Sequence, residues 1–375
     1  MRHTHDHYMT MAVRLALRGH GGAEPNPLVG CVIVSDRDTV VGWGYHGRCG
    51  GPHAEIVALR RAGERAAGST VYVTLEPCNH TGRTGPCAEA LIGAGVARTV
   101  LAGRDPSPNA GGGAERLRAA GIAVETFSTC QAATALNEPY LYRVRTGLPW
   151  VVCKWAQTID GRIATRSGES RWLSNALSRR LVHRERGRVD AILTGIGTVI
   201  ADDPLLTARC VRRRRIARRV VVDPKLAIPL KSKLILTASE APVTVACEER
   251  LLAEGGPRAA ALAAAGVELI GVRTDGRHLS LVTLLGELAK RHETATVLVD
   301  GGAGLLGRLF QERLVNQTWV VIVPRVFGDE QAIPCVRGLT VRTLTEGVQL
   351  KLADVRRRGD DVLLRYDVID QNPPV

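Results

Sequence analysis

The chain has 375 residues, of which 45% are hydrophobic, and its formal net charge is +13. At about 100–200 residues per domain, this length favours two domains. The longest apolar runs fall short of the roughly 18 residues that suggest a membrane span. The N-terminal stretch also lacks the apolar core and cleavage site of a signal peptide, so we expect no membrane partner and a cytoplasmic location. The nine cysteines are mostly scattered singly, which argues against a disulfide framework.

The excess of basic residues is compatible with nucleic-acid binding, for which the run RRRRIARR at 212–219 is the best candidate patch. Only 4% of the residues are aromatic, however, which leaves few side chains for base stacking. The run is explained more simply as a solvated loop before a strand. We therefore expect a phosphorylated small molecule as the partner, and no nucleic acid.

The first part of the chain alternates helices and strands, as its apolar spacing and its glycine and proline positions indicate. This order predicts an α/β three-layer sandwich of about 125 residues. The expected elements are a helix at 7–17, two strands around a turn within 29–46, a helix at 53–66, a strand at 70–77, a helix at 85–95, a strand at 98–103, a helix at 112–121 and a strand at 122–126.

A further helical stretch at 131–145 leads to the segment TGLPW at 146–150, where we place the boundary between domains 1–146 and 147–375. The second part starts again with a strand and continues with strands that are separated by helical segments. This pattern predicts a second α/β domain. The expected strands lie at 150–156, 189–195, 219–223, 242–247, 294–300 and 319–324.

A metal site is predicted where two helices begin and one strand ends. His53 and Glu55 open a helix only two positions apart, so their side chains point to different sides of it. Cys78 ends a strand and Cys87 begins the next helix. His53, Cys78 and Cys87 then supply one imidazole and two thiolates to a tetrahedral Zn²⁺ whose fourth position stays open for water. Glu55 stands beside that position as the catalytic group that moves protons.

The same residues match the zinc-deaminase signature H-x-E…P-C-x-x-C, except that eight residues separate the two cysteines here. Such a cysteine pair is a weak metal signal by itself, and the nearby His-Ala-Glu and Glu-Pro-Cys sequences strengthen it. The alternatives are a chance arrangement of three buried residues and a purely structural zinc. A structural zinc usually recruits a fourth protein ligand, and it leaves Glu55 without a role.

A glycine-rich segment suggests a second chemistry. Gly302, Gly304 and Gly307 fit G-x-G-x-x-G after a strand and at the start of a helix, which predicts a pyrophosphate held at the helix N-terminus. A Rossmann domain carries this motif near its start, with an acidic residue about 20 positions later. Here the motif lies deep in the domain and the next strand ends in Pro324 and Arg325. We therefore expect phosphate binding without a Rossmann fold, and NADP rather than NAD.

Sequence segments along both halves resemble a known enzyme family. PNPLVGCVIV, GWGYHGRCGGPHAEIVAL, VYVTLEPCNHTGRTGPC and GRDPSPN are similar to the deaminase half of the bifunctional riboflavin-biosynthesis deaminase–reductases. CKWAQTIDGRIA, SGESRWLS, TGIGTVIADDPLLTAR and VDGGAGLLG are similar to the reductase half. The resemblance implies a cytidine-deaminase-like sandwich followed by a dihydrofolate-reductase-like domain, and it covers essentially the whole chain.

For the first half, the resemblance implies hydrolytic deamination of 2,5-diamino-6-(5-phosphoribosylamino)pyrimidin-4-one, with zinc-activated water attacking and Glu55 moving the protons. By analogy, Asn26 contacts the pyrimidine. The residues expected along the ribose-phosphate are His46, His80, Arg83 and Asp105. The alternative for Asn26 is a turn residue between prolines, and the alternative for His46, His80 and Arg83 is an ordinary polar loop residue. Ser107 stands where the family often has Asn, so the contact at that position is open.

For the second half, the resemblance implies hydride transfer from NADPH to C1′ of the opened ribosylamine, giving 5-amino-6-(5-phosphoribitylamino)uracil. The implied cofactor contacts are Ala156, Trp172, Thr198, Asp202, Gly302, Gly304 and Gly307. The implied substrate contacts are Lys154, Ser170, Arg186, Leu206, Arg209 and Asp300. Asp300 replaces the glutamate common in the family. Lys154 and Asp202 are the nearest candidates for a proton donor.

Two alternatives stay open from the sequence. The zinc centre also suits a nucleic-acid deaminase that carries an additional α/β module. The C-terminal half is also compatible with a degenerate scaffold that only promotes oligomerisation. For the bifunctional enzyme we expect a homo-oligomer.

Overall fold

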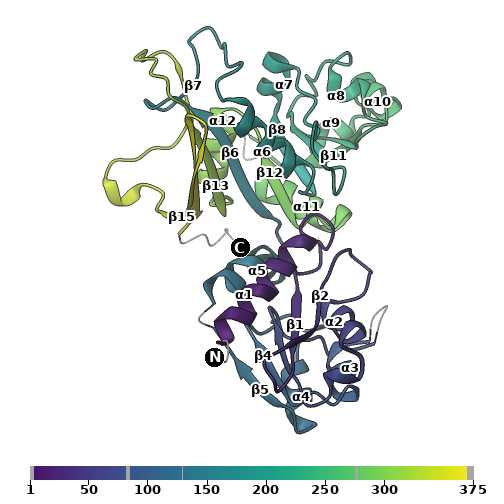
Figure 1. Cartoon of the computed structure of the whole chain (residues 1–375). Helices are drawn as coiled ribbons and strands as arrows, with labels where there is room; N and C mark the ends of the chain where they lie inside the picture. The colour runs from purple at the N-terminus through teal and green to yellow at the C-terminus, as the bar shows by residue number, and fades with distance from the viewer. Residues whose placement is uncertain (1–3, 82–84, 129, 275–277, 370–375) are drawn as a thin grey trace. The chain divides into compact units, whose positions relative to one another are not determined.

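A computed structural model describes residues 4–81, 85–128, 130–274 and 278–369 (Figure 1). The chain divides into two compact units, residues 1–147 and 148–375. Each unit has its own sheet and its own core, and each is described by itself below. Within the described residues, no helix is both long enough and apolar enough to cross a membrane.

The first unit is built on a five-stranded sheet with the order β2-β1-β3-β4-β5. β1 runs antiparallel to β2 and β3, whereas β3, β4 and β5 run parallel. These parallel strands end at the same edge, which brings together the loops that follow them. The strands are β1 Gly30–Val34, β2 Val40–Tyr45, β3 Thr70–Val73, β4 Arg98–Leu101 and β5 Ala123–Thr126.

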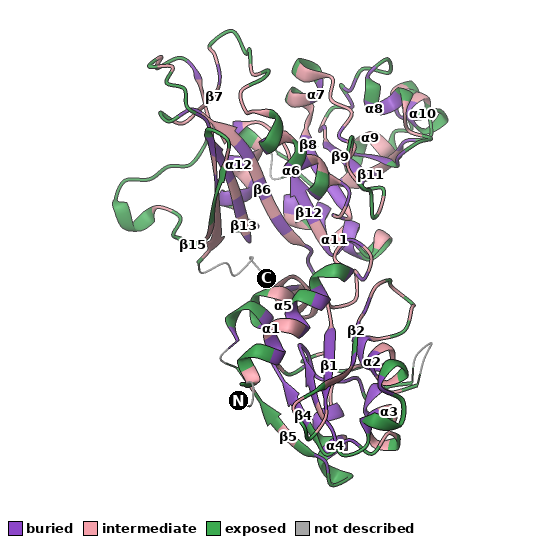
Figure 2. Cartoon of the chain, in the orientation of Figure 1, coloured by how far each residue is buried: buried purple, intermediate pink, exposed green. Residues whose placement is uncertain are grey.

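Helices cover both faces of this sheet, and side chains alternate between the two cores as the strand period requires. Cys31 and Ile33 of β1 pack toward α2, α3 and α4, whereas Val32 and Val34 pack toward α1 and α5. Figure 2 shows the central strands buried between these layers. The predicted three-layer sandwich is therefore present. The helices are α1 His5–Ala16, η1 Leu17–Gly19, α2 Ala54–Ala62, η2 Gly63–Ala66, α3 Cys87–Gly93, α4 Gly113–Ala119 and α5 Gln131–Thr146.

Helix α2 lies unusually close to strand β2. A side chain at Gly42 or Gly44 would place its Cβ 2.4 or 2.3 Å from the carbonyl oxygen of Ala58 or Ala54. Only glycine permits such an approach. The two glycines thereby fix the helix start that carries His53 and Glu55. The single helix expected at 53–66 is interrupted, because α2 ends at Ala62 and a short 3₁₀ turn follows.

The second unit is built on a nine-stranded sheet with the order β11-β10-β9-β8-β12-β6-β13-β16-β15. Neighbouring strands are parallel from β11 to β13, and the β15–β16 hairpin continues the sheet antiparallel to β13. The strands are β6 Trp150–Gln157, β8 Ala191–Gly195, β9 Arg218–Val222, β10 Val243–Glu248, β11 Glu268–Val272, β12 Thr296–Val299, β13 Gln317–Ile322, β15 Leu350–Arg358 and β16 Asp361–Val368.

Helices pack on both faces of the second sheet, whose inner strands are nearly continuous apolar runs, as parallel strands usually are. Ile192, Val221 and Val245 belong to its larger core, and Leu181 of α6 packs on Val321 and Leu363 in a smaller one. The helices are α6 Ala176–Arg186, α7 Ile196–Asp202, α8 Lys233–Leu236, α9 Glu249–Ala253, α10 Pro257–Ala264, α11 Leu281–His292, α12 Ala303–Gln311 and η3 Leu344–Glu346. β7 Arg162–Ala164 and β14 Ile333–Pro334 form a separate two-stranded ribbon.

Candidate active sites

One group of metal-binding side chains gathers in the first unit. His53 precedes α2 in extended conformation, Cys78 follows β3, and Cys87 is the first residue of α3. The Nδ1 atom of His53 lies 3.2 Å from Cys87 Sγ and 3.5 Å from Cys78 Sγ. All three ligand atoms lie within 4.8 Å of one another. One nitrogen and two sulfurs at this spacing suit a Zn²⁺ ion that keeps an open coordination position.

Glu55 stands beside this group in the first turn of α2. Its side chain is buried, and its Oε2 atom has no hydrogen-bond partner among the described residues. Burial raises the pKa of Glu55 to about 7. The hydrogen bond from the Cys87 thiol lowers the pKa of Cys78, and the bond to His53 adds to this effect. The residues present therefore fit zinc: a thiolate is favoured among the ligands, and an unpaired carboxylate oxygen is free to exchange protons near neutral pH.

A cavity of about 170 Å³ opens over this group. Asn26 Nδ2 lies 3.2 Å from His46 Nε2, and His46 Nδ1 lies 3.1 Å from the Pro52 carbonyl oxygen. Burial lowers the pKa of His46, so the ring is neutral at pH 7, with Nδ1–H donating to Pro52. The predicted residues that line the cavity are Asn26, His46, His53, Glu55, Cys78, His80 and Asp105. Arg83 lies outside the described residues.

The sequence interpretation missed two polar residues that line this cavity, Glu76 and Tyr140. The buried carboxylate of Glu76 accepts hydrogen bonds from the backbone N–H groups of Asp105 at 3.0 Å and Ala114 at 2.8 Å. The glutamate in Glu-Pro-Cys therefore ties the 104–105 loop and the start of α4 to the end of β3. A strand-end glutamate next to a ligand cysteine is a signal that could have indicated this role.

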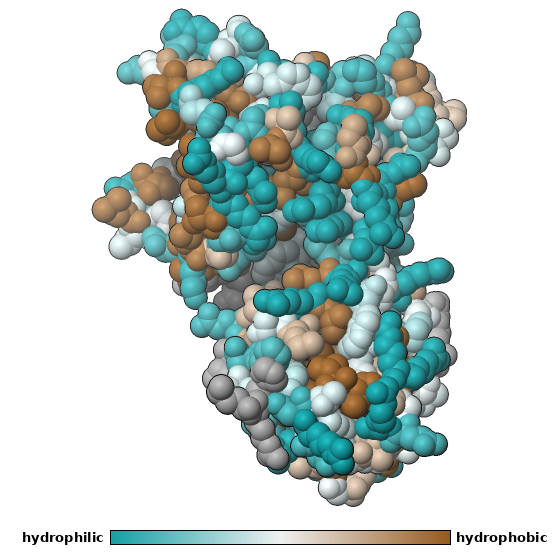
Figure 3. Space-filling model, viewed as in Figure 1, coloured by the Kyte–Doolittle hydropathy of each residue, from teal (hydrophilic) through white to brown (hydrophobic). Residues whose placement is uncertain are grey.

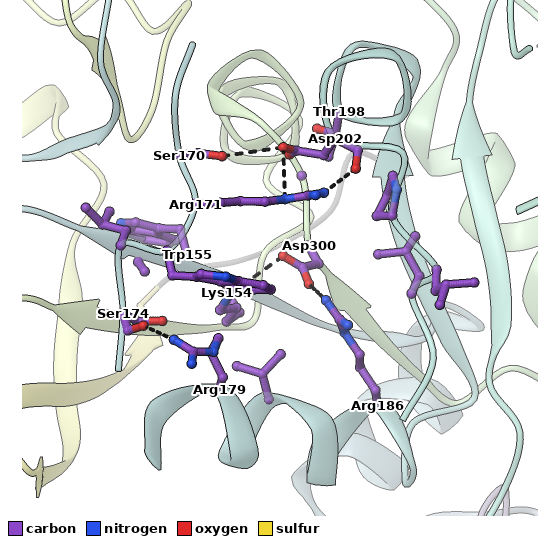
Figure 4. Close-up of a pocket in the computed structure, with 18 of the residues that line it drawn as sticks. Lys154, Trp155, Ser170, Arg171, Ser174, Arg179, Arg186, Thr198, Asp202 and Asp300 are labelled. Carbon is purple, nitrogen blue, oxygen red and sulfur yellow. Dashed lines mark hydrogen bonds and ion pairs between the residues drawn. The ribbon is translucent and has the colours of Figure 1, made fainter. Parts of the chain in front are cut away.

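The second unit holds a larger cavity, of about 390 Å³, near the carboxyl ends of its central strands (Figure 4). All the predicted substrate contacts of this half line it, together with most of the predicted cofactor contacts. These residues are Lys154, Ala156, Ser170, Trp172, Arg186, Thr198, Asp202, Leu206, Arg209, Asp300 and Gly302.

Opposite charges meet at the floor of this cavity. Asp300 follows β12, and its carboxylate lies 3.7 Å from Lys154 Nζ of β6 and in direct contact with the guanidinium of Arg186 from α6 (Figure 4). Burial alone would raise the pKa of Asp300, but the two cations outweigh it and hold the pKa well below its usual range. Two cations thus share one carboxylate, which leaves net positive charge for an anionic ligand.

A second set of contacts forms the opposite wall. Asp202, at the end of α7, accepts a hydrogen bond from Ser170 at 3.4 Å and pairs with Arg171 Nε at 3.5 Å. Gly302 precedes α12, and a Cβ built there would lie 3.6 Å from Thr198 Oγ1 of α7. The starts of α7 and α12 therefore approach each other at the cavity. Backbone N–H groups at helix starts, in a cavity that Arg209 and Lys154 also line, suit phosphorylated ligands.

The two other glycines of the motif do not line this cavity. A Cβ at Gly307 would lie 1.8 Å from the Arg337 carbonyl oxygen, so close packing accounts for that glycine. Gly304 has open space around it. Of the three glycines, only Gly302 is placed to contact a ligand there.

The sequence interpretation also missed residues on one face of α6. Arg179, Val182, His183 and Arg186 line the cavity at positions i, i+3, i+4 and i+7. Only Arg186 was predicted, although the helical spacing points to the others. Arg171 and Trp155 were missed as well, and neither has a comparable pattern.

Comparison with known proteins shows two families along the chain. Residues 2–103 match the cytidine and deoxycytidylate deaminase zinc-binding region, and residues 149–364 match the RibD C-terminal domain. The riboflavin biosynthesis protein RibD of Escherichia coli is 40% identical over 96% of this chain and 98% of its own length. The chain belongs to the RibD family. RibD of Aquifex aeolicus is 37% identical over 98% of this chain and 99% of its own length.

Solved RibD structures agree with this assignment. RibD of Acinetobacter baumannii superposes with a TM-score of 0.85 at 37% identity, covering 98% of this chain and 99% of that one. A deaminase/reductase from Thermotoga maritima gives 0.83 at 31% identity, covering 97% and 98%. The expected fold class, a cytidine-deaminase-like sandwich followed by a dihydrofolate-reductase-like domain, is confirmed. The chain is a bifunctional deaminase–reductase of riboflavin biosynthesis that acts on a small molecule and uses zinc and NADPH.

Proposed function

We propose that residues 1–146 deaminate 2,5-diamino-6-(5-phosphoribosylamino)pyrimidin-4-one and that residues 147–375 reduce the ribosyl chain of the product. The observation that carries this assignment is the group formed by His53, Cys78 and Cys87, beside which the Oε2 atom of Glu55 has no hydrogen-bond partner among the described residues. The second support is the cationic cavity around Asp300, which suits two phosphorylated ligands.

In the deaminase site, His53, Cys78 and Cys87 would hold the zinc ion, which would supply the Lewis acidity that activates water at neutral pH. Glu55 takes up one proton of the water and delivers it to the ring nitrogen. It then moves the second proton, from the hydroxyl group added to the ring carbon, to the amine, which departs as ammonia. A carboxyl group whose pKa is about 7 is suited to both transfers.

Recognition in this site falls to the polar residues of the cavity. Asn26 contacts the pyrimidine, and its neighbour His46 stays neutral and directs the Asn26 amide. His80, which is exposed at the cavity, binds along the ribose-phosphate together with Asp105. Arg83 is proposed for the phosphate on the family resemblance alone.

In the reductase site, NADPH supplies the hydride, and the chain binds and orients the two reactants. Thr198, Asp202 and Gly302 are assigned to the cofactor, together with Ala156 and Trp172. Arg186, Arg209, Ser170 and Leu206 are assigned to the ribosyl-phosphate substrate. Each of these residues lines the same cavity.

We assign the reductase proton donor to Lys154 rather than Asp202. Lys154 Nζ is cationic beside Asp300, so it carries a proton that it can give to the sugar oxygen. Asp202 instead accepts a hydrogen bond from Ser170 and pairs with Arg171, so its carboxylate already serves two donors of the chain.

We further propose that the enzyme is a homo-oligomer that assembles through β15. This strand is the edge of the nine-stranded sheet, and Leu350, Leu352 and Val355 on it are exposed. The preceding segment exposes Leu344 as well, and Figure 3 shows apolar residues gathered over this region. An edge strand that exposes apolar side chains among its charged ones is a template for a second chain. We expect Leu352→Lys to convert the assembly to monomers in sedimentation velocity, and an unchanged assembly contradicts this interface.

A cytoplasmic location is proposed on the state of the thiols. All nine cysteines are free, which is typical of proteins kept in a reducing compartment.

A two-step assay tests the proposed function. The zinc-loaded enzyme should release one ammonia per diaminopyrimidine substrate without NADPH. When NADPH is added, the enzyme should oxidise one equivalent of NADPH for each molecule of deaminated product. Ammonia release without any NADPH oxidation would leave the second half as a scaffold, and deamination of tRNA in preference to the phosphoribosyl-pyrimidine would favour a nucleic-acid deaminase.

A further inference from the structure

Helix α5 carries two polar side chains that hold two walls of the deaminase cavity. Asn137 and Tyr140 are three residues apart and therefore lie on one face of the helix. Asn137 Oδ1 accepts a hydrogen bond from the Leu28 N–H at 3.0 Å, beside the loop that carries Asn26. The Tyr140 hydroxyl donates to the carboxylate of Asp105, at 3.1 Å from Oδ1 and 3.2 Å from Oδ2.

Tyr140 and Asp105 both line the cavity, and Asp105 is only 9% exposed. The Oδ1 atom of Asp105 also accepts from the Ser107 N–H at 2.9 Å. Because Oδ1 serves this second donor, Oδ2 is the oxygen with more acceptor capacity left for a ligand. A carboxylate repels phosphate but accepts hydrogen bonds from a neutral hydroxyl or amine. Tyr140 and Asp105 are therefore placed to bind a neutral hydrogen-bond donor of the substrate through the Asp105 carboxylate.

The match to the deaminase family ends at residue 103, before both Asp105 and α5. Without the hydroxyl of Tyr140, the Ser107 N–H would be the one remaining donor to the Asp105 carboxylate within the described part of the chain, and rotation about the Cβ–Cγ bond would be less restricted. The contact from α5 adds a second restraint on this rotation.

We propose that Tyr140 is a positioning residue that orients Asp105 to accept a hydrogen bond from a sugar hydroxyl or an amine of the substrate. This inference rests on the proposed deaminase function. It assigns to α5, which follows the zinc-binding region in sequence, a part in the selection of a ribosylated pyrimidine.

The test compares Tyr140→Phe, Asp105→Asn and the double variant in steady-state ammonia release from the phosphoribosyl substrate. We expect Tyr140→Phe to raise KM about tenfold, since a hydrogen bond to a charged group is lost, while kcat stays within about twofold. The double variant should have the KM of Asp105→Asn, because both changes act through one carboxylate. An unchanged KM in Tyr140→Phe, or effects that multiply in the double variant, would overturn the proposal.

Tyr8→Phe is the matched control. Tyr8 also donates to an aspartate, Asp38 at 2.9 Å, in the same unit, but it does not line the cavity. Tyr8→Phe should leave the KM for the phosphoribosyl substrate unchanged. Zinc content and NADPH oxidation should be unchanged in both Tyr8→Phe and Tyr140→Phe. A purely structural role for Tyr140 would instead lower zinc content or kcat, and this result contradicts the proposal.

Two substrate analogues identify the group that Asp105 meets. The KM effect of Tyr140→Phe should persist on the substrate without phosphate, and its disappearance there contradicts the proposal. If the effect is lost on the analogue without ribose 2′- and 3′-hydroxyls, the donor is a hydroxyl; if it remains, the donor is an amine. A wild-type enzyme that releases no ammonia would instead refute the proposed function, so the two failures are distinguishable.

Discussion

Glu55 has a buried carboxylate oxygen without a described hydrogen-bond partner, next to three metal-binding side chains. We expect Glu55→Gln to keep its zinc, because the ligands are intact, and to lose deamination by about 10²–10⁴-fold, because the proton shuttle is gone. Metal analysis measures the zinc content, and ammonia release measures the deaminase activity. Glu64→Gln, an exposed change in the same unit, should retain activity. Near-normal turnover of Glu55→Gln would refute the assigned role.

Asp300 makes a prediction about pH, because its folded-state pKa lies below its unfolded value. A carboxyl group whose pKa is lower in the folded protein stabilises the fold at pH values above its unfolded pKa. This stabilisation is lost as the pH falls through the folded pKa. Asp300→Asn should therefore lower the free energy of unfolding by about 2 kcal/mol at pH 7, since it leaves two cations unpaired. The difference from wild type should shrink below about pH 4.

Urea unfolding followed by tryptophan fluorescence measures this difference, because four of the five tryptophans lie in the second unit. Asp360→Asn, which changes an exposed aspartate, is the control. A difference that stays constant down to pH 3 would contradict the pairing of Asp300 with Lys154 and Arg186.

At the scale of single residues, the sequence predicted which side chains gather at a site when the chemistry of that site requires those residue types at that spacing. His53, Glu55, Cys78 and Cys87 are such residues, since few other roles explain their spacing. Tyr140 was missed because its partner Asp105 is 35 positions away, and no local pattern links them. Gly307 fits a phosphate motif, but its neighbour is the Arg337 carbonyl, a tertiary contact that the sequence does not reveal.

Among the elements, α6 depends on the β15–β16 hairpin for the position of its N-terminus. Asp361, at the start of β16, is buried and accepts hydrogen bonds from the Asn175 N–H at 2.9 Å and Ser178 Oγ at 2.7 Å. Asn175 itself caps the helix by accepting from the Ser178 N–H. The same helix carries Arg186 into the reductase cavity.

We expect Asp361→Ala to lower the stability of the second unit by about 3 kcal/mol, because two hydrogen bonds to a buried charge are lost. NADPH oxidation should fall with it, as α6 loses its anchor. Unfolding by urea and the reductase assay measure these effects. The neighbouring exposed residue gives the control Asp360→Ala, and equal behaviour of the two variants would contradict the anchoring role.

The expected strands were those with continuous apolar runs, such as β6, β8 and β12. β15 and β16 were missed because LKLADVRRR and DVLLRYDV carry charges at many positions, as suits a strand with exposed side chains. β11, in ELIGV, is short and contains a glycine. The order of strands in the sheet follows from long-range pairing, which local sequence does not specify.

For the whole molecule, the two units have separate sheets, cores and cavities, so their chemistries should be separable. Cys87→Ser should release zinc and abolish deamination while NADPH oxidation with the deaminated intermediate stays near wild type. Cys49→Ser, which alters a half-buried cysteine outside the metal group, should retain both activities. Loss of reduction in Cys87→Ser would indicate that the units fold or act together.

The central claim is that one imidazole and two thiolates hold a zinc ion with a fourth position left for water. X-ray absorption at the zinc edge of the purified enzyme tests it most directly. We predict two sulfur neighbours at about 2.3 Å and two nitrogen or oxygen neighbours at about 2.0–2.1 Å. Three or four sulfur neighbours, or none, would contradict this assignment of the metal site and the deaminase mechanism built on it.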